Sequence, residues 1–164
     1  AARALLRPTW GGVAAGCALG VVMVLATHAG FALLAPRVPG VREATAQLFG
    51  ALAVGAFSSS VRAGLIVVVA SCEEVIFRGA ALGGAGQGVG TWRALDRRAL
   101  ARVVLMAVAY ALGTLPLGNG LLVLCAMACG LVWGAARLAS GSLFVAICAH
   151  VVWDVGVLVA WPLL

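Results

Sequence analysis

Long stretches without a charged residue are the feature that most limits what this chain can fold into. Residues 8–36, and all residues between Arg102 and Arg137, contain no Asp, Glu, Lys or Arg. A helix rises about 1.5 Å per residue, so about 20 apolar residues cross a bilayer and each stretch is long enough. Only 10% of the residues are charged, against about a quarter in soluble domains. The chain is therefore expected to be a multi-pass integral membrane protein.

Proline, glycine and arginine divide these apolar stretches into six expected helices. We predict transmembrane helices at residues 8–36, 44–61, 63–82, 103–114, 121–138 and 143–164. Small residues are dense throughout, as close helix packing in lipid requires. The predicted fold class is therefore all-α: a polytopic transmembrane helix bundle of about six helices, in a single domain covering residues 1–164.

Arginine, which supplies every basic residue of the chain, predicts the orientation. Three arginines precede the first helix or lie in the second connection: Arg3, Arg7 and Arg62. Seven lie in the first, third and fifth connections: Arg37, Arg42, Arg93, Arg97, Arg98, Arg102 and Arg137. The positive-inside rule then predicts that the odd connections are cytoplasmic and that both termini lie outside. The net charge of +6 is thus explained by topology and lipid headgroups, not by nucleic acid. The Lys-free, Ala-rich and Gly-rich composition favours a bacterial cytoplasmic (inner) membrane.

Two carboxylates and a guanidinium interrupt an otherwise apolar helix, at Glu73, Glu74 and Arg78. Charges within a membrane helix are costly and therefore indicate a functional site. Glu74 and Arg78 are four residues apart, so they share a helix face and can pair. Glu73 lies about 100° round the helix, which leaves it unpaired and suited to act as a general base. A salt-bridged structural triad is the alternative interpretation.

A second polar pair lies in the last predicted helix, where His150 and Asp154 are also four residues apart. The pair predicts either a stabiliser of negative charge or a structural hydrogen bond between helices. Ser142 lies about 12 Å from His150 along the same helix, which argues against a serine protease. The chain contains no HExxH and no CxxC, so we predict no metal and no cofactor.

The two polar segments resemble the motifs of a known family. Residues 73–79 (EEVIFRG) resemble the EExxxR motif of the CAAX protease and bacteriocin-processing (CPBP, or Abi) family, and residues 150–154 (HVVWD) resemble its HxxxN/D motif. The resemblance covers residues 62–157 and implies a glutamic-type intramembrane endopeptidase. It implies that Glu73 activates water and that His150 and Asp154 form the oxyanion site. The expected substrate is a membrane-associated protein or peptide, cut near its C-terminus or at the membrane edge.

One departure from the family pattern concerns its middle motif, FxxxH. Residues 110–116 (YALGTLP) match this segment, but Thr114 stands where the family has a water-activating histidine. We therefore expect Thr114 to orient the water in place of that histidine. The alternative is a catalytically silent membrane scaffold that binds a partner helix. A transporter is a third hypothesis, since a buried Glu–His pair can relay protons.

Overall fold

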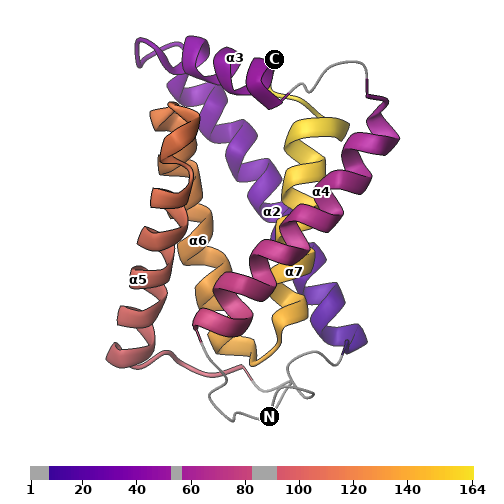
Figure 1. Ribbon diagram of the computed structural model, residues 1–164, viewed down its shortest axis with the longest axis vertical. Coiled ribbons are helices and arrows are strands. Elements are labelled where there is room, and N and C mark those ends of the chain that lie inside the picture. Colours follow the sequence, from indigo (N-terminus) through magenta and orange to yellow (C-terminus); the bar gives the residue numbers. More distant parts are fainter. Residues whose placement is uncertain (1–7, 53–56, 83–91) are drawn as a thin grey trace.

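The computed structural model describes residues 8–52, 57–82 and 92–164, and these residues form six α-helices (Figure 1). The helices are α2 (Trp10–Leu34), α3 (Val41–Leu52), α4 (Ser59–Glu74), α5 (Arg97–Gly113), α6 (Gly120–Ser140) and α7 (Leu143–Val155). Two of them continue as π-helices, α4 into η1 (Val75–Ala81) and α7 into η3 (Gly156–Ala160). The 3-10 turn η2 (Leu115–Leu117) follows α5. The prediction of an all-α helix bundle is confirmed.

Four helices are long and apolar enough to cross a membrane: α2, α5 together with η2, α6, and α7 together with η3. The pair α4–η1 traverses the bundle as well (Figure 1). Its composition alone does not mark it as a span, because it carries Glu73, Glu74 and Arg78. It corresponds to the helix predicted at residues 63–82, extended at its start because the Ser58 side chain caps it by accepting from Val61 N.

The predicted span at residues 44–61 is wrong. Helix α3 has 12 residues, about 18 Å of helix, which is too short to cross a bilayer. Residues 57 and 58 are not helical, and α4 has begun by residue 59; residues 53–56 lie outside the described part of the chain. Figure 1 shows α3 lying across one end of the bundle. The Asn119 side chain fixes it there, because its Nδ2 donates to the Ala44 carbonyl at 2.8 Å.

The position of α3 changes the predicted grouping of the arginines. Because α3 does not cross, the end of α2 and the start of α4 lie at the same end of the bundle (Figure 1). Arg37 and Arg42 therefore share an end with Arg62, not with the arginines around the start of α5. The start of α2 lies at the opposite end, with the starts of α5 and α7 (Figure 1).

The remaining boundaries follow local capping. Helix α5 begins at Arg97, ahead of the predicted residue 103, because Asp96 caps it by accepting from Ala99 N at 2.7 Å. Helix α6 agrees closely with the prediction of 121–138. A left-handed Gly141, with φ of +67°, ends α6 and lets the chain turn into α7.

Glycines let α2 approach α7, the helix that carries His150. A Cβ atom added at Gly16 would lie 2.6 Å from the Val145 carbonyl oxygen, and one at Gly20 would lie 2.7 Å from Val152 Cβ. The two glycines are four residues apart, the small-xxx-small spacing of close membrane helix pairs. Trp153 adds a polar contact, donating from Nε1 to Thr27 Oγ1 at 2.9 Å. Helix α2 thus packs closely against α7 and holds it in position.

Candidate functional site

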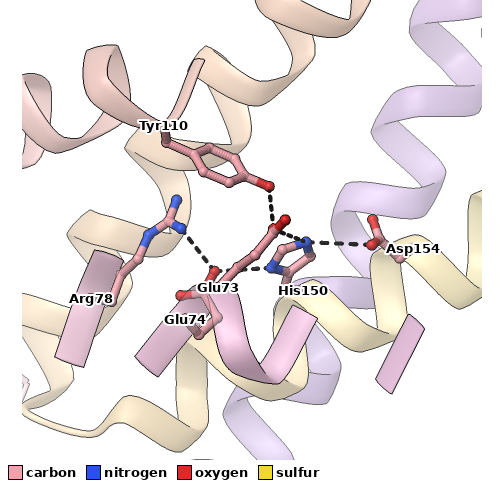
Figure 2. A network of polar contacts seen from close by, with 6 residues as sticks. All are labelled: Glu73, Glu74, Arg78, Tyr110, His150 and Asp154. Carbon is pink, nitrogen blue, oxygen red and sulfur yellow. Dashed lines mark hydrogen bonds and ion pairs between the residues drawn. The ribbon is translucent and has the colours of Figure 1, made fainter. Parts of the chain in front are cut away.

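Three helices bring six polar side chains together into one network of polar contacts (Figure 2). The end of α4 and the first turn of η1 supply three, α5 supplies one and α7 supplies two: Glu73, Glu74, Arg78, Tyr110, His150 and Asp154. The family resemblance implied that Glu73 and the His150–Asp154 pair act in one site, although their helices are far apart in the chain. The structure brings these groups together.

Glu74 has no solvent exposure and contacts two partners. Its Oε1 lies 3.1 Å from Arg78 Nη1 and 2.9 Å from His150 Nδ1. Arg78 is itself 1% exposed, so the pair is a buried one. Removing one member of such a pair would leave an uncompensated charge in a low-dielectric interior. The pairing of Glu74 with Arg78 is the one that their spacing predicted. Through its second contact, with His150, Glu74 also holds η1 and α7 in position relative to each other.

Glu73, the next residue, has a different environment. Its side chain is 34% exposed, and its Oε2 accepts a hydrogen bond from the Tyr110 hydroxyl at 2.8 Å. The His150 Nε2 atom lies 3.9 Å from the same oxygen. No salt bridge joins Glu73 to an arginine among the described residues. Of the two adjacent carboxylates, this one is accessible to a reacting group.

His150 lies between the carboxylates and is held in a fixed plane. Its ring stacks on Trp133 of α6, with centroids 3.7 Å apart and planes 20° apart. Nδ1 faces Glu74, while Nε2 lies 3.4 Å from Asp154 Oδ2 and faces the Glu73 side. Donation from Nδ1 to Glu74 sets one proton position, so Nε2 carries a hydrogen only when the ring is doubly protonated. In that form His150 offers a donor toward the space beside Glu73.

Tyr110 is the member of the cluster that the sequence analysis did not assign a role. Its hydroxyl bonds to Glu73, and the Arg78 guanidinium carbon lies 4.6 Å from its ring centroid, a cation–π distance. It therefore connects Glu73 to the buried Glu74–Arg78 pair. The available signal was that the chain has a single tyrosine, one helical turn before Thr114.

Thr114 is the C-cap of α5, and its hydroxyl donates to the Ala111 carbonyl at 2.8 Å. The hydroxyl that does reach Glu73 is that of Tyr110, one turn earlier on α5. The Thr114 hydroxyl therefore bonds to a backbone carbonyl at the end of its own helix, and no hydrogen bond to the cluster is seen for it among the described residues. The expectation that Thr114 orients a water beside Glu73 remains a prediction.

Both helices that carry the motifs widen into π-helix, one within its motif and the other just after it. The α-to-π change follows Glu74 in one case and Val155, the residue after Asp154, in the other. Isolated π-helical turns are rare and occur frequently at functional sites. One change falls within the polar cluster, between Glu74 and Arg78, and the other directly after Asp154, which supports the assignment of the cluster as the functional site.

The cluster does not have the form of a metal centre. Within the described ranges, no group of three or more His, Cys, Asp and Glu side chains is arranged to hold a metal ion. The five cysteines are free thiols.

Comparison with known protein families gives a match over more than half of the chain. The family described as Rce1-like, type II CAAX prenyl endopeptidase Rce1-like, matches residues 55–156. This range contains the whole polar cluster. Curated proteins and solved structures give no match. The resemblance first seen in the motifs at residues 73–79 and 150–154 is confirmed, and the chain belongs to the Rce1-like family of CAAX-type intramembrane proteases.

Proposed function

We propose that the protein is an intramembrane endopeptidase in which Glu73 activates a water molecule. The observation that carries this proposal is the contrast between the two neighbouring carboxylates. Glu74 is buried and occupied by Arg78 and His150, whereas Glu73 is 34% exposed and held by a single hydroxyl. A base must be positioned yet able to reach a water, and Glu73 meets both conditions.

The chemistry follows from the groups that face Glu73. The Glu73 carboxylate takes a proton from water as the water oxygen bonds to the scissile carbonyl carbon. The carbonyl oxygen gains the negative charge and accepts a hydrogen bond from Nε2–H of doubly protonated His150. The amide C–N bond then breaks, and Glu73 returns its proton to the leaving nitrogen. Each proton and electron pair is accounted for without a further reactant.

Asp154 supports His150 in this scheme. Its Oδ2 lies 3.4 Å from Nε2, so an ionised Asp154 favours a proton on that nitrogen. An ionised carboxylate would repel an oxyanion, so Asp154 contributes directly only if it is a neutral acid. We therefore assign the donor role to His150 and a positioning role to Asp154.

The substrate class that fits is a membrane-associated protein or peptide. The cluster lies among helices that are apolar enough to cross a bilayer, so the scissile bond must come within the membrane or at its edge. Cleavage near the C-terminus of the substrate is the arrangement that the family description suggests. The Lys-free composition favours a bacterial cytoplasmic membrane.

One observation favours the second candidate, a catalytically silent scaffold that binds a partner helix. The chain has two histidines, His28 and His150. His28 lies near the C-terminal end of α2, where it contacts Trp161. The His28 ring stacks on Trp161 at 3.8 Å and its Nε2 lies 2.9 Å from the Trp161 carbonyl oxygen. No histidine other than His150 is therefore available to assist Glu73.

Cleavage of a defined peptide distinguishes the two candidates. The purified protein in lipid nanodiscs would be incubated with an S-farnesyl-cysteine peptide that ends in three apolar residues, and the products weighed by mass spectrometry. We expect hydrolysis on the C-terminal side of the modified cysteine by the wild type. Glu73→Gln should lose at least about 100-fold in rate while eluting as a folded protein. Binding of the peptide without any cleavage would favour the scaffold.

A further inference from the structure

A second arginine lies inside the bundle without a counter-charge. Arg137, near the end of α6, is 2% exposed. Its Nε and Nη2 atoms are buried and have no hydrogen-bond partner, and no salt bridge includes it among the described residues. Arg78 also has two buried nitrogens without a hydrogen-bond partner, but it has Glu74 as a counter-charge at 3.1 Å. A buried guanidinium without a partner is costly, which suggests that its partner is supplied from outside the chain.

By its spacing of four residues, Arg137 shares a face of α6 with Trp133. Trp133, one turn earlier on that face, stacks on His150. On the same side, a Cβ atom at Gly130 would lie 3.4 Å from Arg78 Nη2, and one at Gly134 would lie 3.1 Å from a methyl carbon of Val103 on α5. Arg137 is thus about 6 Å along α6 from the residue that supports His150.

The unpartnered atoms define the ligand chemistry. Nε and Nη2 form one edge of the planar guanidinium, with two parallel N–H groups. This edge matches the two oxygens of a carboxylate or of a phosphate. A lipid phosphate would lie at the lipid-facing surface, whereas Arg137 is enclosed by helices. A peptide that enters the site brings its own carboxylate, at its C-terminus.

We propose that Arg137 binds the C-terminal carboxylate of the substrate through its Nε–Nη2 edge. The proposal rests on the proposed function and adds a specificity residue to it. An extended peptide covers about 3.3 Å per residue, so a leaving peptide of two or three residues spans about 7–10 Å. One helical turn along α6, about 6 Å, separates the level of Trp133, and so of His150, from that of Arg137, which is the reach of a leaving peptide of about two residues. Arg137 would then measure the distance from the scissile bond to the end of the chain.

The test compares binding of two peptides that differ only at the C-terminus. The protein carries Glu73→Gln, so that binding is measured without cleavage. The probes are the farnesylated peptide with a free carboxylate and the same peptide as a C-terminal amide. We expect the acid to bind about tenfold more tightly than the amide or better, and Arg137→Gln to abolish this preference. Arg137→Lys should retain part of it, because a point charge replaces the fork.

Arg102→Gln provides the matched control, because Arg102 is exposed on α5 and should leave the preference unchanged. Arg137→Met should keep or raise the unfolding midpoint of the free protein, since it removes an unpaired buried charge. A preference for the acid that survives in Arg137→Gln would overturn the assignment while leaving the proposed function intact. A large drop in the midpoint of Arg137→Met would also overturn it, by showing a structural partner. Failure of both peptides to bind would contradict the proposed function and this inference together.

Discussion

At the scale of single residues, the site depends on two adjacent glutamates that face different surroundings. Successive residues of a helix point about 100° apart, so Glu73 and Glu74 cannot share an environment. Glu74 turns toward η1 and α7 and is fully buried, while Glu73 turns toward Tyr110 and remains partly exposed. One carboxylate can therefore hold the helices together while the other carries out proton transfer.

Tyr110 should matter for turnover more than Thr114 does. Tyr110→Phe removes the hydroxyl that holds Glu73 and keeps the ring over Arg78. A hydrogen bond to a charged group contributes about 1.5–3 kcal/mol, so we expect kcat to fall about 10- to 100-fold with little change in KM. Thr114→Ala, one turn away on α5, removes the other candidate hydroxyl and should cost less than Tyr110→Phe, since the Thr114 hydroxyl donates to the Ala111 carbonyl. A larger loss in Thr114→Ala than in Tyr110→Phe would contradict this assignment.

Most of the cluster could be predicted from the sequence, because charges are conspicuous within apolar helices. Five charged or titratable residues of the two motif helices meet in one place: Glu73, Glu74, Arg78, His150 and Asp154. Tyr110 was missed because an aromatic side chain in a membrane helix usually serves packing. Its hydroxyl acquires a role only when α5 lies beside α4, which spacing along one helix cannot show.

At the scale of helices, the position of α7 depends on its contact with α2. The glycines of α2 bring its backbone against α7, where even a methyl group at residue 20 would lie 2.8 Å from the Ala149 carbonyl oxygen. The next residue of α7 is His150. The packing of α2 against α7 therefore sets the position of the histidine relative to Glu73 and Glu74.

Gly20→Ala should destabilise the protein, and Gly30→Ala should not. The new methyl group at residue 20 overlaps backbone and Val152, and overpacking of this kind costs about 1–3 kcal/mol. At residue 30 of the same helix nothing lies within 4 Å of an added Cβ, so the better helix propensity of alanine should hold or raise stability. The unfolding midpoint in detergent, followed by circular dichroism, measures both. Equal midpoints for the two variants would mean that α2 and α7 do not pack in this way.

The misassigned span shows what hydropathy cannot decide. Residues 44–61 are small and apolar enough on average to suggest a crossing, but Ser58 caps a new helix inside that range. Helix α3 also carries Arg42 and Glu43 in its first turn, which favours a position at the membrane surface. A helix cap is a local signal. Here the cap at Ser58 starts a new helix within a range whose average composition suggested a single span.

At the scale of the whole molecule, the arginines still divide unequally between the two ends. Arg37, Arg42 and Arg62 lie at one end, while the opposite end has the larger group: Arg93, Arg97, Arg98 and Arg102. Arg137, predicted in a connection, instead lies buried within α6. The positive-inside rule therefore predicts that the start of α5 is cytoplasmic. The same rule now predicts a cytoplasmic start of α2 as well, because α3 does not cross.

Thiol labelling in intact cells tests this topology. In a variant without native cysteines, Ala94→Cys should resist a membrane-impermeant maleimide and Val38→Cys should react. Both positions are exposed and neither substitution removes a charge. The earlier prediction, with a crossing at residues 44–61, places the two positions on the same side of the membrane. Identical labelling of both cysteines would therefore support a membrane crossing at residues 44–61. The reverse pattern would show that the protein has the opposite orientation in the membrane.

The measurement that tests the central claim most directly compares Glu73→Gln with Glu74→Gln for activity per folded molecule and for folded yield. We predict that Glu73→Gln accumulates like the wild type and loses at least about 100-fold in kcat/KM. Glu74→Gln should accumulate poorly, because stranding the buried Arg78 costs about 3–5 kcal/mol, while its folded fraction retains more activity than Glu73→Gln. Wild-type activity in Glu73→Gln, or an unfolded Glu73→Gln beside a stable Glu74→Gln, would contradict the division of roles between the two carboxylates.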